Sequence, residues 1–548
     1  MTSEPSTYAL RTRRRSLKAL LRLPLFPRAS AFTHPISSRS APGPLGTVPP
    51  DIILEIVENL GSYDILSFSL TSSQLRELLL PELYRTVYLR SSRTCASGLR
   101  MLTRRPDLCA YIQKLAVRPN YYLAWPKVDQ PLSEDWVASM ISKIAQNLTR
   151  LHTFDWDGLE MPADSLWLTL RNACPELKQV FSNLGHQPLD PYSQLFQFDD
   201  LTNFSLSVRH GLGETDAFPT PEELPTQLWD MLFQRCPNLE ELTLCSFSAS
   251  HRLIDINKVT QGTWPKLHSL TLGSFGFNID LTLSSPPAEL FGTFLSSHLE
   301  LSYIRLSWNF KRWISPDEMP TYLKPTALPG LDSFVGVFQQ VTELPAPACA
   351  SLTTLDLMCE PLYASRTDAL LSTLRALPAL AHLDIWAHVP DPGAGHTGFF
   401  RGLLGACPGL EDLHFMCTTS FGKKPLSELA AHLHLLPHLR SFTLTKGHRY
   451  ADESMLRSAL RVLRAPGVSP RLAQVSVRWA RAKCRNHLKQ EGQYDVVTVG
   501  VGGERTVEAW ERGLRAVGAA FERRYRYTLV GGDGDAGSGG GGFALMRR

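Results

Sequence analysis

A spaced pattern of apolar residues, L-x-x-L-x-L with other apolar residues allowed, recurs along most of this chain and constrains its fold more than any other feature. Clear copies begin at Leu239, Leu267, Leu301, Leu352, Leu380, Leu410, Leu439 and Leu472. Weaker copies begin at Ile112, Leu151, Leu177, Leu201 and Leu331. The 360 residues from Ile112 to Leu472 contain 12 steps, a mean of 30 residues each. A period in this range predicts an array of stacked repeats.

Each copy of the pattern predicts a short strand followed by a helix. The second and third apolar positions alternate, which is typical of a strand with one inward face. The segments between copies are amphipathic, and we expect helices over 220–235, 367–377, 397–406, 426–436 and 452–464. Neither element can bury its apolar face alone, so neighbouring units must stack. The prediction is an α/β solenoid over residues 90–480, with parallel strands and outer helices.

Cysteines and prolines recur just before several strands, as at Cys174-Pro175, Cys236-Pro237 and Cys407-Pro408. Cysteine pairs 236/245, 349/359 and 407/417 have similar spacings that would suit a metal or a disulfide, but no CxxC occurs. Their place in the repeat favours a role at helix ends and strand starts. We therefore expect the ten cysteines to be structural thiols of a reduced, intracellular protein, mostly buried.

Over residues 110–480 the repeat resembles the leucine-rich-repeat family, which implies a horseshoe with strands lining the concave face. One departure concerns the Asn that members of the family often place three residues after the last strand position. Among the clear copies, only Asn309 occupies this position. The convex turns are therefore expected to be irregular.

A helical unit is predicted ahead of the repeats, over residues 48–89. Pro49 and Pro50 suit the first turn of a helix, because proline lacks the amide hydrogen that would have no partner there. Three apolar stripes follow at helical spacing, made of Ile52, Ile53, Ile56, Val57 and Leu60, then Ile65, Leu66 and Leu70, then Leu75, Leu78, Leu79 and Leu83. Three helices this short show more apolar surface than they can cover, so a partner or an adjoining domain is expected to bury the rest.

This unit resembles an F-box. The matching segments are Pro-Pro-Asp-Ile-Ile-Leu-Glu-Ile at 49–56, Asp-Ile-Leu at 64–66, Gln-Leu-Arg at 74–76 and Pro-Glu-Leu-Tyr at 81–84. The resemblance implies docking on a Skp-type adaptor and, through it, on a cullin–RING ubiquitin ligase. The implied adaptor contacts are Pro49, Pro50, Ile52, Ile53, Ile56, Leu60, Ile65 and Leu66. Leu75 stands where many F-boxes have Trp.

Charge is concentrated in the N-terminal leader. Residues 1–50 contain eight Lys or Arg and one acid, for +7, and the chain as a whole carries +4, which leaves about −3 for the rest. The folded part therefore has no general basic field, and no nucleic-acid partner is predicted. We interpret residues 1–47 as a disordered basic, Ser- and Pro-rich leader; a mitochondrial transit peptide and a nuclear localisation patch are alternatives.

No run of residues is long and apolar enough to cross a membrane, so we predict no membrane partner. We expect an intracellular protein, in the cytoplasm, the nucleus or both.

The C-terminal region predicts a cap over 481–530 and a flexible Gly-rich tail over 531–548. Within the cap, a Gly-rich turn at 500–503 follows a predicted strand at 496–499 and precedes a predicted helix at 507–523. Such a turn can cradle a phosphate, but it lacks the Lys and Ser/Thr of a P-loop. A tight turn that closes the cap is the favoured interpretation.

No linear motif for catalysis is present. The chain lacks GxxxxGKS/T, HExxH and GxSxG, and we predict no catalytic residue, metal or cofactor. Function is then expected from surface recognition, by strand residues on the concave face. These candidate substrate contacts, expected to be exposed, are Arg305, Ser307, Asp356, His382, Asp384, Trp386, Asp412, His414 and Arg478. The alternative for Trp386 is packing under a loop.

A helical docking motif followed by a recognition solenoid resembles the class of F-box proteins with leucine-rich repeats. This order predicts the substrate-recognition subunit of an SCF-type E3 ubiquitin ligase, which is not itself an enzyme. The alternative is a scaffold outside the ubiquitin system, whose N-terminal helices only cap the solenoid.

Overall fold

The computed structural model describes residues 48–120, 131–185, 187, 189–208, 222–246, 252–253, 256–274, 285–308, 323–363, 366–389, 396–417, 421–447, 453–481, 484–499, 504–514 and 520–528. The chain divides into two compact units. The first contains residues 5–217 and 224–243, and the second consists mainly of residues 244–548.

Three helices open the first unit: α2 (Pro50–Glu58), α3 (Ser62–Ser69) and α4 (Ser73–Tyr84). Pro50 is the first residue of α2, and the Ser72 hydroxyl caps α4 by accepting from the amide of Leu75 at 3.1 Å. The helices share a small core of Ile53, Val57, Leu75 and Leu79, none of them more than 4% exposed. The predicted helical unit thus has a hydrophobic centre of its own.

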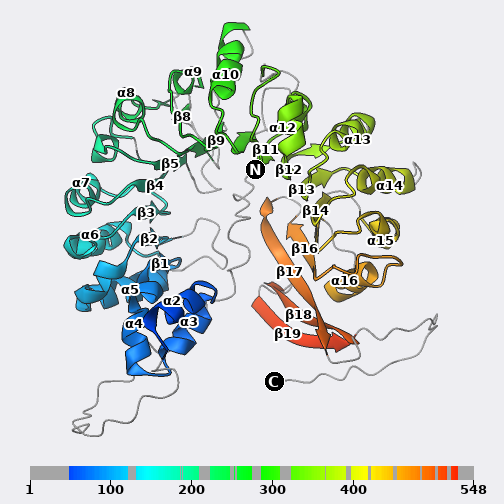
Figure 1. Cartoon of the computed structure of the whole chain (residues 1–548), viewed down its shortest axis with the longest axis horizontal. Coiled ribbons are helices and arrows are strands. Elements are labelled where there is room, and N and C mark those ends of the chain that lie inside the picture. The colour runs from blue at the N-terminus through cyan, green and yellow to red at the C-terminus, as the bar shows by residue number, and fades with distance from the viewer. Residues whose placement is uncertain are drawn as a thin grey trace. The chain divides into compact units, whose positions relative to one another are not determined.

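Parallel strands follow in the same unit, each with a helix behind it (Figure 1). The strands are β1 (Thr86–Leu89), β2 (Lys114–Val117), β3 (Thr153–Trp156), β4 (Gln179–Leu184) and β5 (Asn203–Val208). The helical elements are α5 (Ser92–Arg104), η3 (Pro106–Tyr111), α6 (Glu134–Ile144), η4 (Ala145–Asn147), α7 (Asp164–Ala173), η5 (Gln194–Gln197), α8 (Thr226–Asp230) and the π-helical turn η6 (Met231–Arg235). The apolar positions pair in register, in the order Val87, Leu115, Phe154, Val180, Phe204.

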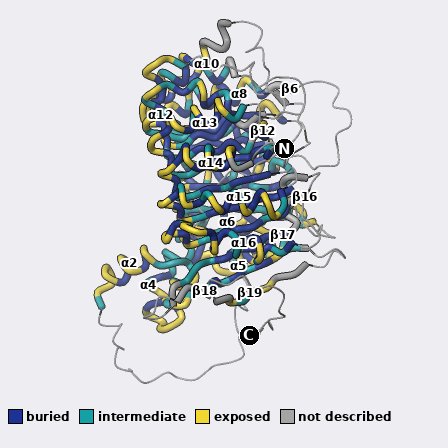
Figure 2. Tube along the Cα trace, turned by 90° about the vertical axis from the view of Figure 1, so that its right-hand side faces the viewer, coloured by how far each residue is buried: buried dark blue, intermediate teal, exposed yellow. Residues whose placement is uncertain are grey.

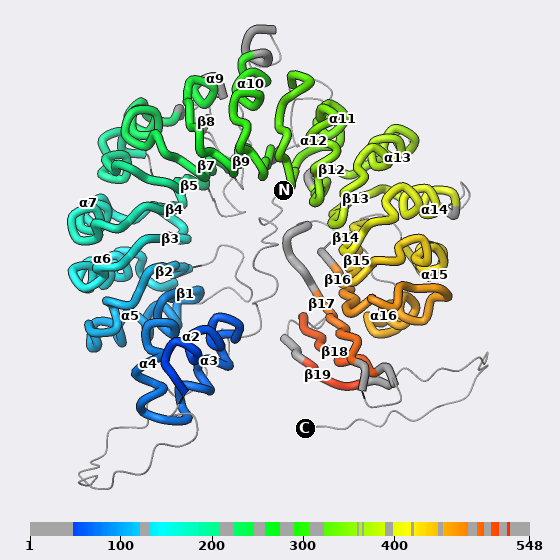
Figure 3. The backbone as a smooth tube through the Cα atoms, viewed as in Figure 1, coloured from blue at the N-terminus to red at the C-terminus, as the bar shows by residue number. Residues whose placement is uncertain are grey.

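The second unit repeats this construction, as its backbone trace shows (Figure 3). Its parallel strands are β9 (Ser269–Ser274), β10 (Tyr303–Trp308), β11 (Ser333–Val335), β12 (Thr354–Leu362), β13 (His382–Ala387), β14 (Asp412–Cys417), β15 (Ser441–Lys446) and β16 (Gln474–Arg481). Its helical elements are α9 (Ile256–Val259), α10 (Ser285–Ser297), α11 (Phe338–Thr342), α12 (Ala346–Ser351), α13 (Thr367–Arg375), α14 (His396–Ala406), α15 (Lys423–Ala431), η9 (Leu433–Leu435) and α16 (Met455–Leu463). Strand β7 (Glu241–Ser246) falls at the division between the units.

One apolar ladder runs through the second unit. It pairs Leu270, Ile304, Phe334, Leu355, Leu383, Leu413, Phe442 and Val475 in register, and each side chain is at most 2% exposed. The copies of L-x-x-L-x-L therefore fall on stacked parallel strands. The predicted α/β leucine-rich-repeat solenoid is confirmed, with helices over the other side of the strands (Figure 1).

Two predicted helices differ from the structure. The helix expected over 220–235 begins only at Thr226, because Glu222–Glu223 form strand β6, which pairs with β8 (Arg252–Leu253). The helix expected over 507–523 is wrong. This region belongs to β18 (Glu504–Leu514) and β19 (Ala520–Thr528), which continue antiparallel from β17 (Cys484–Val499). The Gly-rich turn at 500–503 lies outside the described residues.

The alternation of β18 explains why a strand forms there. Every second side chain is buried, at Val507, Ala509 and Glu511. A strand places these three side chains on one face, whereas a helix would place them on different faces. The Tyr494 and Tyr525 hydroxyls donate to the Glu511 carboxylate at 2.6 and 2.7 Å. Burial, together with the nearby carboxylate, raises the pKa of Tyr494. The tyrosines therefore stay protonated donors, which ties the three antiparallel strands together.

Eight cysteines whose side chains the structure describes are free thiols, and all of these except the half-buried Cys349 are buried. Burial raises the pKa of the Cys95, Cys174 and Cys407 thiols to about 12. Thiols of this kind are unreactive packing groups at neutral pH. The described ranges contain no group of His, Cys, Asp and Glu arranged to hold a metal ion. Among the helices that the structure describes, none is long and apolar enough to cross a membrane.

A buried ion pair joins the last residue of β15 to Glu453, two residues before α16. The Lys446 ammonium donates to both oxygens of Glu453 at 2.6 and 2.7 Å, and the Ser458 hydroxyl donates to one of them at 3.0 Å. The Lys446 side chain is fully buried, and burial holds its pKa below the ordinary value although the Glu453 carboxylate acts against this. Removing one partner of such a pair leaves the other charge buried and uncompensated.

We expect Lys446→Met to lower the free energy of unfolding at this site by about 3–5 kcal/mol, because Glu453 loses its counter-ion. The double variant Lys446→Met/Glu453→Gln removes both charges and is expected to recover most of that loss. Hydrogen-exchange protection of β15 and α16 measures both effects. Equal losses in the single and double variants would contradict the account.

Candidate functional site

Exposed apolar side chains gather on the N-terminal helices. Nine large apolar side chains are exposed in the part of the chain that the structure describes, and four of them lie between residues 52 and 70. They are Ile52 at 47%, Ile56 at 48%, Tyr63 at 48% and Leu70 at 63% exposed. Much of α2 is exposed in Figure 2. Exposed apolar side chains that lie together are typical of an interaction surface, whereas single exposed ones are common on any protein.

Helix α2 divides its isoleucines between two faces. Ile53 and Val57 point into the core shared with α4, whereas Ile52 and Ile56, four residues apart, share an exposed face. We call Ile52 and Ile56 the α2 outer face. A helix that serves only as a cap is expected to present polar residues outward. The α2 outer face does the opposite, which makes it the candidate docking site.

The implied adaptor contacts fall into three groups by burial. Pro49, Pro50, Ile52 and Ile56 are exposed, whereas Leu60, Ile65 and Leu66 are half-buried. Ile53 is 4% exposed and belongs to the helices' own core, so its side chain supports the docking surface from beneath. Leu75, which replaces the Trp of many F-boxes, packs in the same core.

The helical unit is joined to the repeats without a linker. Arg85 alone separates α4 from β1, and β1 pairs in parallel with β2. The Arg85 carbonyl accepts from the amides of Gln113 and Lys114 at 2.9 and 3.0 Å. Helix α4 also packs against η3. Any protein held on α2 is thereby held close to the first repeats.

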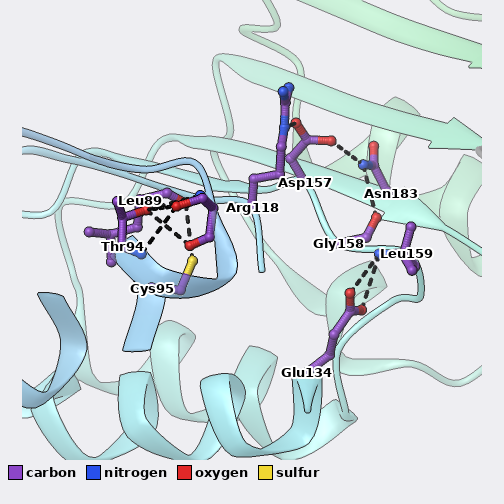
Figure 4. Close-up of polar contacts among 10 residues, drawn as sticks. Leu89, Thr94, Cys95, Arg118, Glu134, Asp157, Gly158, Leu159 and Asn183 are labelled. Atoms are coloured by element: carbon purple, nitrogen blue, oxygen red, sulfur yellow. Dashed lines mark hydrogen bonds and ion pairs between the residues drawn. The ribbon is translucent and has the colours of Figure 1, made fainter. Parts of the chain in front are cut away.

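Polar contacts join the residues directly after β2 and β3 to one another, to β4 and to α6 in the first unit (Figure 4). Arg118 forms an ion pair with Asp157, and the Asn183 amide donates to Asp157 at 2.7 Å and to the Gly158 carbonyl at 3.2 Å. The Glu134 carboxylate accepts from the amide of Leu159 at 2.9 Å. The sequence did not point to these residues. Arg118 and Asp157 share one signal, a position directly after the last apolar residue of a copy, whereas Glu134 lies on α6 and Asn183 on β4 without such a signal.

The candidate substrate contacts in the second unit are less exposed than expected. Arg305 and Trp386 are 2% and 1% exposed, so the expectation that they are exposed is wrong. Asp356 and Asp384 are also buried. His382, Asp412, His414 and Arg478 are half-buried, and the side chain of Ser307 lies outside the described part of the chain. Side chains on adjacent parallel strands stand about 4.8 Å apart, so they cover one another.

Four of these residues form two contacts across neighbouring strands. His382 Nδ1 lies 2.7 Å from an Asp412 oxygen, and His414 Nδ1 lies 3.5 Å from an Asp384 oxygen. His414 Nε2 also lies 2.9 Å from the Thr445 hydroxyl. We call His382, Asp384, Asp412 and His414 the His–Asp ladder. The hydrogen bond that the His382 ring donates to Asp412 raises the pKa of His382 above its ordinary value, although burial acts against this.

Arg478 lies in a different environment at the end of the parallel strands. Glu491 on β17 accepts from Arg478 at 3.0 Å and from Arg512 on β18 at 2.5 Å. Burial would raise the pKa of Glu491, but the two guanidinium groups outweigh it and hold that pKa below the ordinary value. Arg478 is therefore partly neutralised, and it binds the antiparallel strands to β16.

Comparison with known families identifies the N-terminal helices. The model of the F-box domain matches residues 47–81, which cover α2, α3 and most of α4. The chain contains an F-box domain. The α2 outer face is thus the outer face of the first F-box helix. No sequence among curated proteins matches the chain.

Two solved structures show distant similarity. The crystal structure of the Rad7 and Elc1 complex in yeast has 14% identity and a TM-score of 0.34, covering 72% of this chain and 85% of that one. The leucine-rich repeat-containing protein LegL7 from Legionella pneumophila has 14% identity and a TM-score of 0.30, covering 68% of this chain and 92% of that one. TM-scores this low carry no argument about function. The fold is assigned from the strand pairings of the chain itself.

The raised pKa of His382 predicts a pH-dependent contribution to stability. Protonated His382 pairs with Asp412, so the contribution is complete below the unfolded value of 6.5 and is lost as pH rises through the higher folded value. We expect His382→Gln to destabilise β13 and β14 by about 0.5–1 kcal/mol near pH 5.5 and by much less near pH 9. Thermal unfolding at both pH values is the measurement, with the exposed His434→Gln as control. A destabilisation that grows with pH would contradict the assignment.

Proposed function

We propose that the chain is the substrate-recognition subunit of an SCF-type E3 ubiquitin ligase. In this proposal the F-box domain binds a Skp-type adaptor and, through it, a cullin–RING ligase, while the repeats hold a protein substrate. The observation that carries the proposal is the α2 outer face. Ile52 and Ile56 remain about half exposed although the F-box domain has a closed core of its own.

The competing proposal is a scaffold in which the F-box helices only cap the solenoid. A cap would be expected to bury α2 against the repeats or to present a polar outer surface. The exposed isoleucines favour an adaptor, because burying each one from half exposure stabilises a complex by roughly 1 kcal/mol. The F-box match at 47–81 supports the same choice.

The mechanism that we propose is proximity. A substrate on the repeats and an adaptor on α2 would be held by one chain, in which Arg85 alone separates α4 from β1. Attachment to the same chain raises the effective concentration of a substrate lysine near the ligase's charged E2. The proposal assigns no catalytic residue, cofactor, nucleic acid or membrane to the chain. Such a subunit would act inside the cell, in the cytoplasm, the nucleus or both.

The substrate surface that we propose is the face of the strands that carries the His–Asp ladder. The half-buried His382, Asp412, His414 and Arg478 would contact the substrate through their exposed atoms. The buried Arg305, Asp356, Asp384 and Trp386 would hold these neighbours in place from below. We also propose Ser307 as a substrate contact.

The test of adaptor binding is a charge substitution on the α2 outer face. We expect Ile52→Glu/Ile56→Glu to weaken binding to a purified Skp-type adaptor by at least about 30-fold, because two buried apolar contacts are lost and two charges are desolvated. Isothermal titration calorimetry gives the affinity. The folded state should keep its stability, because both side chains point to solvent.

The matched control is Leu168→Glu/Leu299→Glu, which makes the same change at leucines that are 40% and 58% exposed on the repeats. It should bind the adaptor like the parent chain. Unchanged binding in the Ile52/Ile56 variant would refute the adaptor proposal and favour the scaffold. Equal losses in the two variants would show that the effect is not specific to α2.

A further inference from the structure

Positive charge is concentrated in the first repeat. Residues 85–118 contain eight Lys or Arg and one acid, Asp107, for a net charge of +7. The preceding residues 51–84 contain six acids and one basic residue, Arg76, for −5. The following residues 119–470 contain 25 Lys or Arg against 36 Asp or Glu, for −11. The first repeat is therefore a basic segment between two acidic segments.

Helix α5 arranges part of this charge in a line. Arg93, Arg100 and Arg104 are seven and four residues apart, which places them within roughly 40° of one another and along about 16 Å of the helix. All three are exposed. The core face of the helix carries the buried Cys95, Gly98, Leu99 and Leu102. We call Arg93, Arg100 and Arg104 the α5 basic stripe.

The stripe is not neutralised within the described part of the chain. Arg105 pairs with Asp107 at 2.6 Å and Arg118 pairs with Asp157, whereas no described carboxylate forms an ion pair with the α5 basic stripe. The Arg100 guanidinium lies over the ring of Trp136, 5.4 Å from its centroid. Arg100 and Arg104 are four residues apart and repel each other, so the stripe does not stabilise its own helix. Its charge is available to a partner.

We propose that the α5 basic stripe docks an acidic segment of a protein partner. Guanidinium groups bind carboxylates through paired hydrogen bonds, and three of them in a line match carboxylates spaced along an extended or helical segment. A nucleic acid fits less well, because the segments on either side of the first repeat, residues 51–84 and 119–470, carry net charges of −5 and −11 that repel phosphates reaching beyond the stripe. A short acidic segment experiences only the local field, since salt screens charges beyond about 8–10 Å.

This surface is separate from the α2 outer face. Helices α4 and α5 both pack against η3, so the stripe belongs to the same unit as the F-box domain, but it shares no residue with the proposed adaptor contacts. The inference therefore does not depend on adaptor binding. Loss of one activity with retention of the other would distinguish the two surfaces.

The test measures binding of a fluorescein-labelled oligoglutamate peptide, long enough to span the stripe, to the full chain at low ionic strength. Fluorescence anisotropy gives the affinity. We expect Arg93→Glu/Arg100→Glu/Arg104→Glu to weaken binding by about tenfold or more, because three ion pairs are replaced by repulsion. The triple Gln variant should lose less but change in the same direction. Its thermal unfolding, compared with that of the parent chain, shows whether α5 remains folded.

The matched control is Arg375→Glu/Lys424→Glu/Arg457→Glu, which changes the same charge at exposed positions on α13, α15 and α16. It should alter peptide affinity by less than about twofold. If the two triple Glu variants lose peptide affinity equally, the effect comes from net charge alone and the proposal is overturned. Failure of the parent chain to bind the peptide would also overturn it. The proposal would also be overturned if a single-stranded oligonucleotide of equal charge bound more tightly than the peptide and lost affinity in the triple Glu variant of the α5 basic stripe. That result would assign the surface to nucleic acid.

Discussion

Apolar side chains buried between neighbouring strands hold the repeats together. In the second unit a single ladder from Leu270 to Val475 leaves each side chain almost inaccessible to water. No repeat could bury this surface alone. The same close spacing acts on the opposite side of the strands, where polar side chains cover one another. This is why Asp384 is buried while its neighbour His414 keeps only part of its surface exposed.

The junction between the F-box domain and the first repeat determines which helix faces stay free. Strand β1 and helix α5 start the stack, and their apolar side chains Leu89 and Leu99 are buried there. Helix α4 runs directly into β1, so the repeats are joined to the F-box domain through α4 rather than through α2. The outer face of α2 is therefore not needed to hold the chain together. An apolar surface with no structural task inside the chain is the physical basis for assigning it to a partner.

Sequence predicts those features of the structure that depend on local spacing. The L-x-x-L-x-L copies lie on parallel strands, because their apolar positions are only a few residues apart and strand geometry alone places them on one face. The helix expected over 507–523 failed because the same residues also alternate with period two, and pairing with β17 decided between the two patterns. The exposure of Arg305 and Trp386 was mispredicted because it depends on neighbouring strands about 30 residues away in sequence. The α2 outer face could be anticipated from excess apolar residues, but only the structure separates Ile52 and Ile56 from Ile53.

In the proposed function, the F-box domain offers an open apolar surface to an adaptor while the repeats remain free for another protein. Hydrogen–deuterium exchange of the full chain, with and without a Skp-type adaptor, measures this directly. Exchange in α2 and α3 is expected to be slower when the adaptor is present, with no change across β12 to β16. Slower exchange across β12 to β16, or no change in α2 and α3, would refute the proposed function.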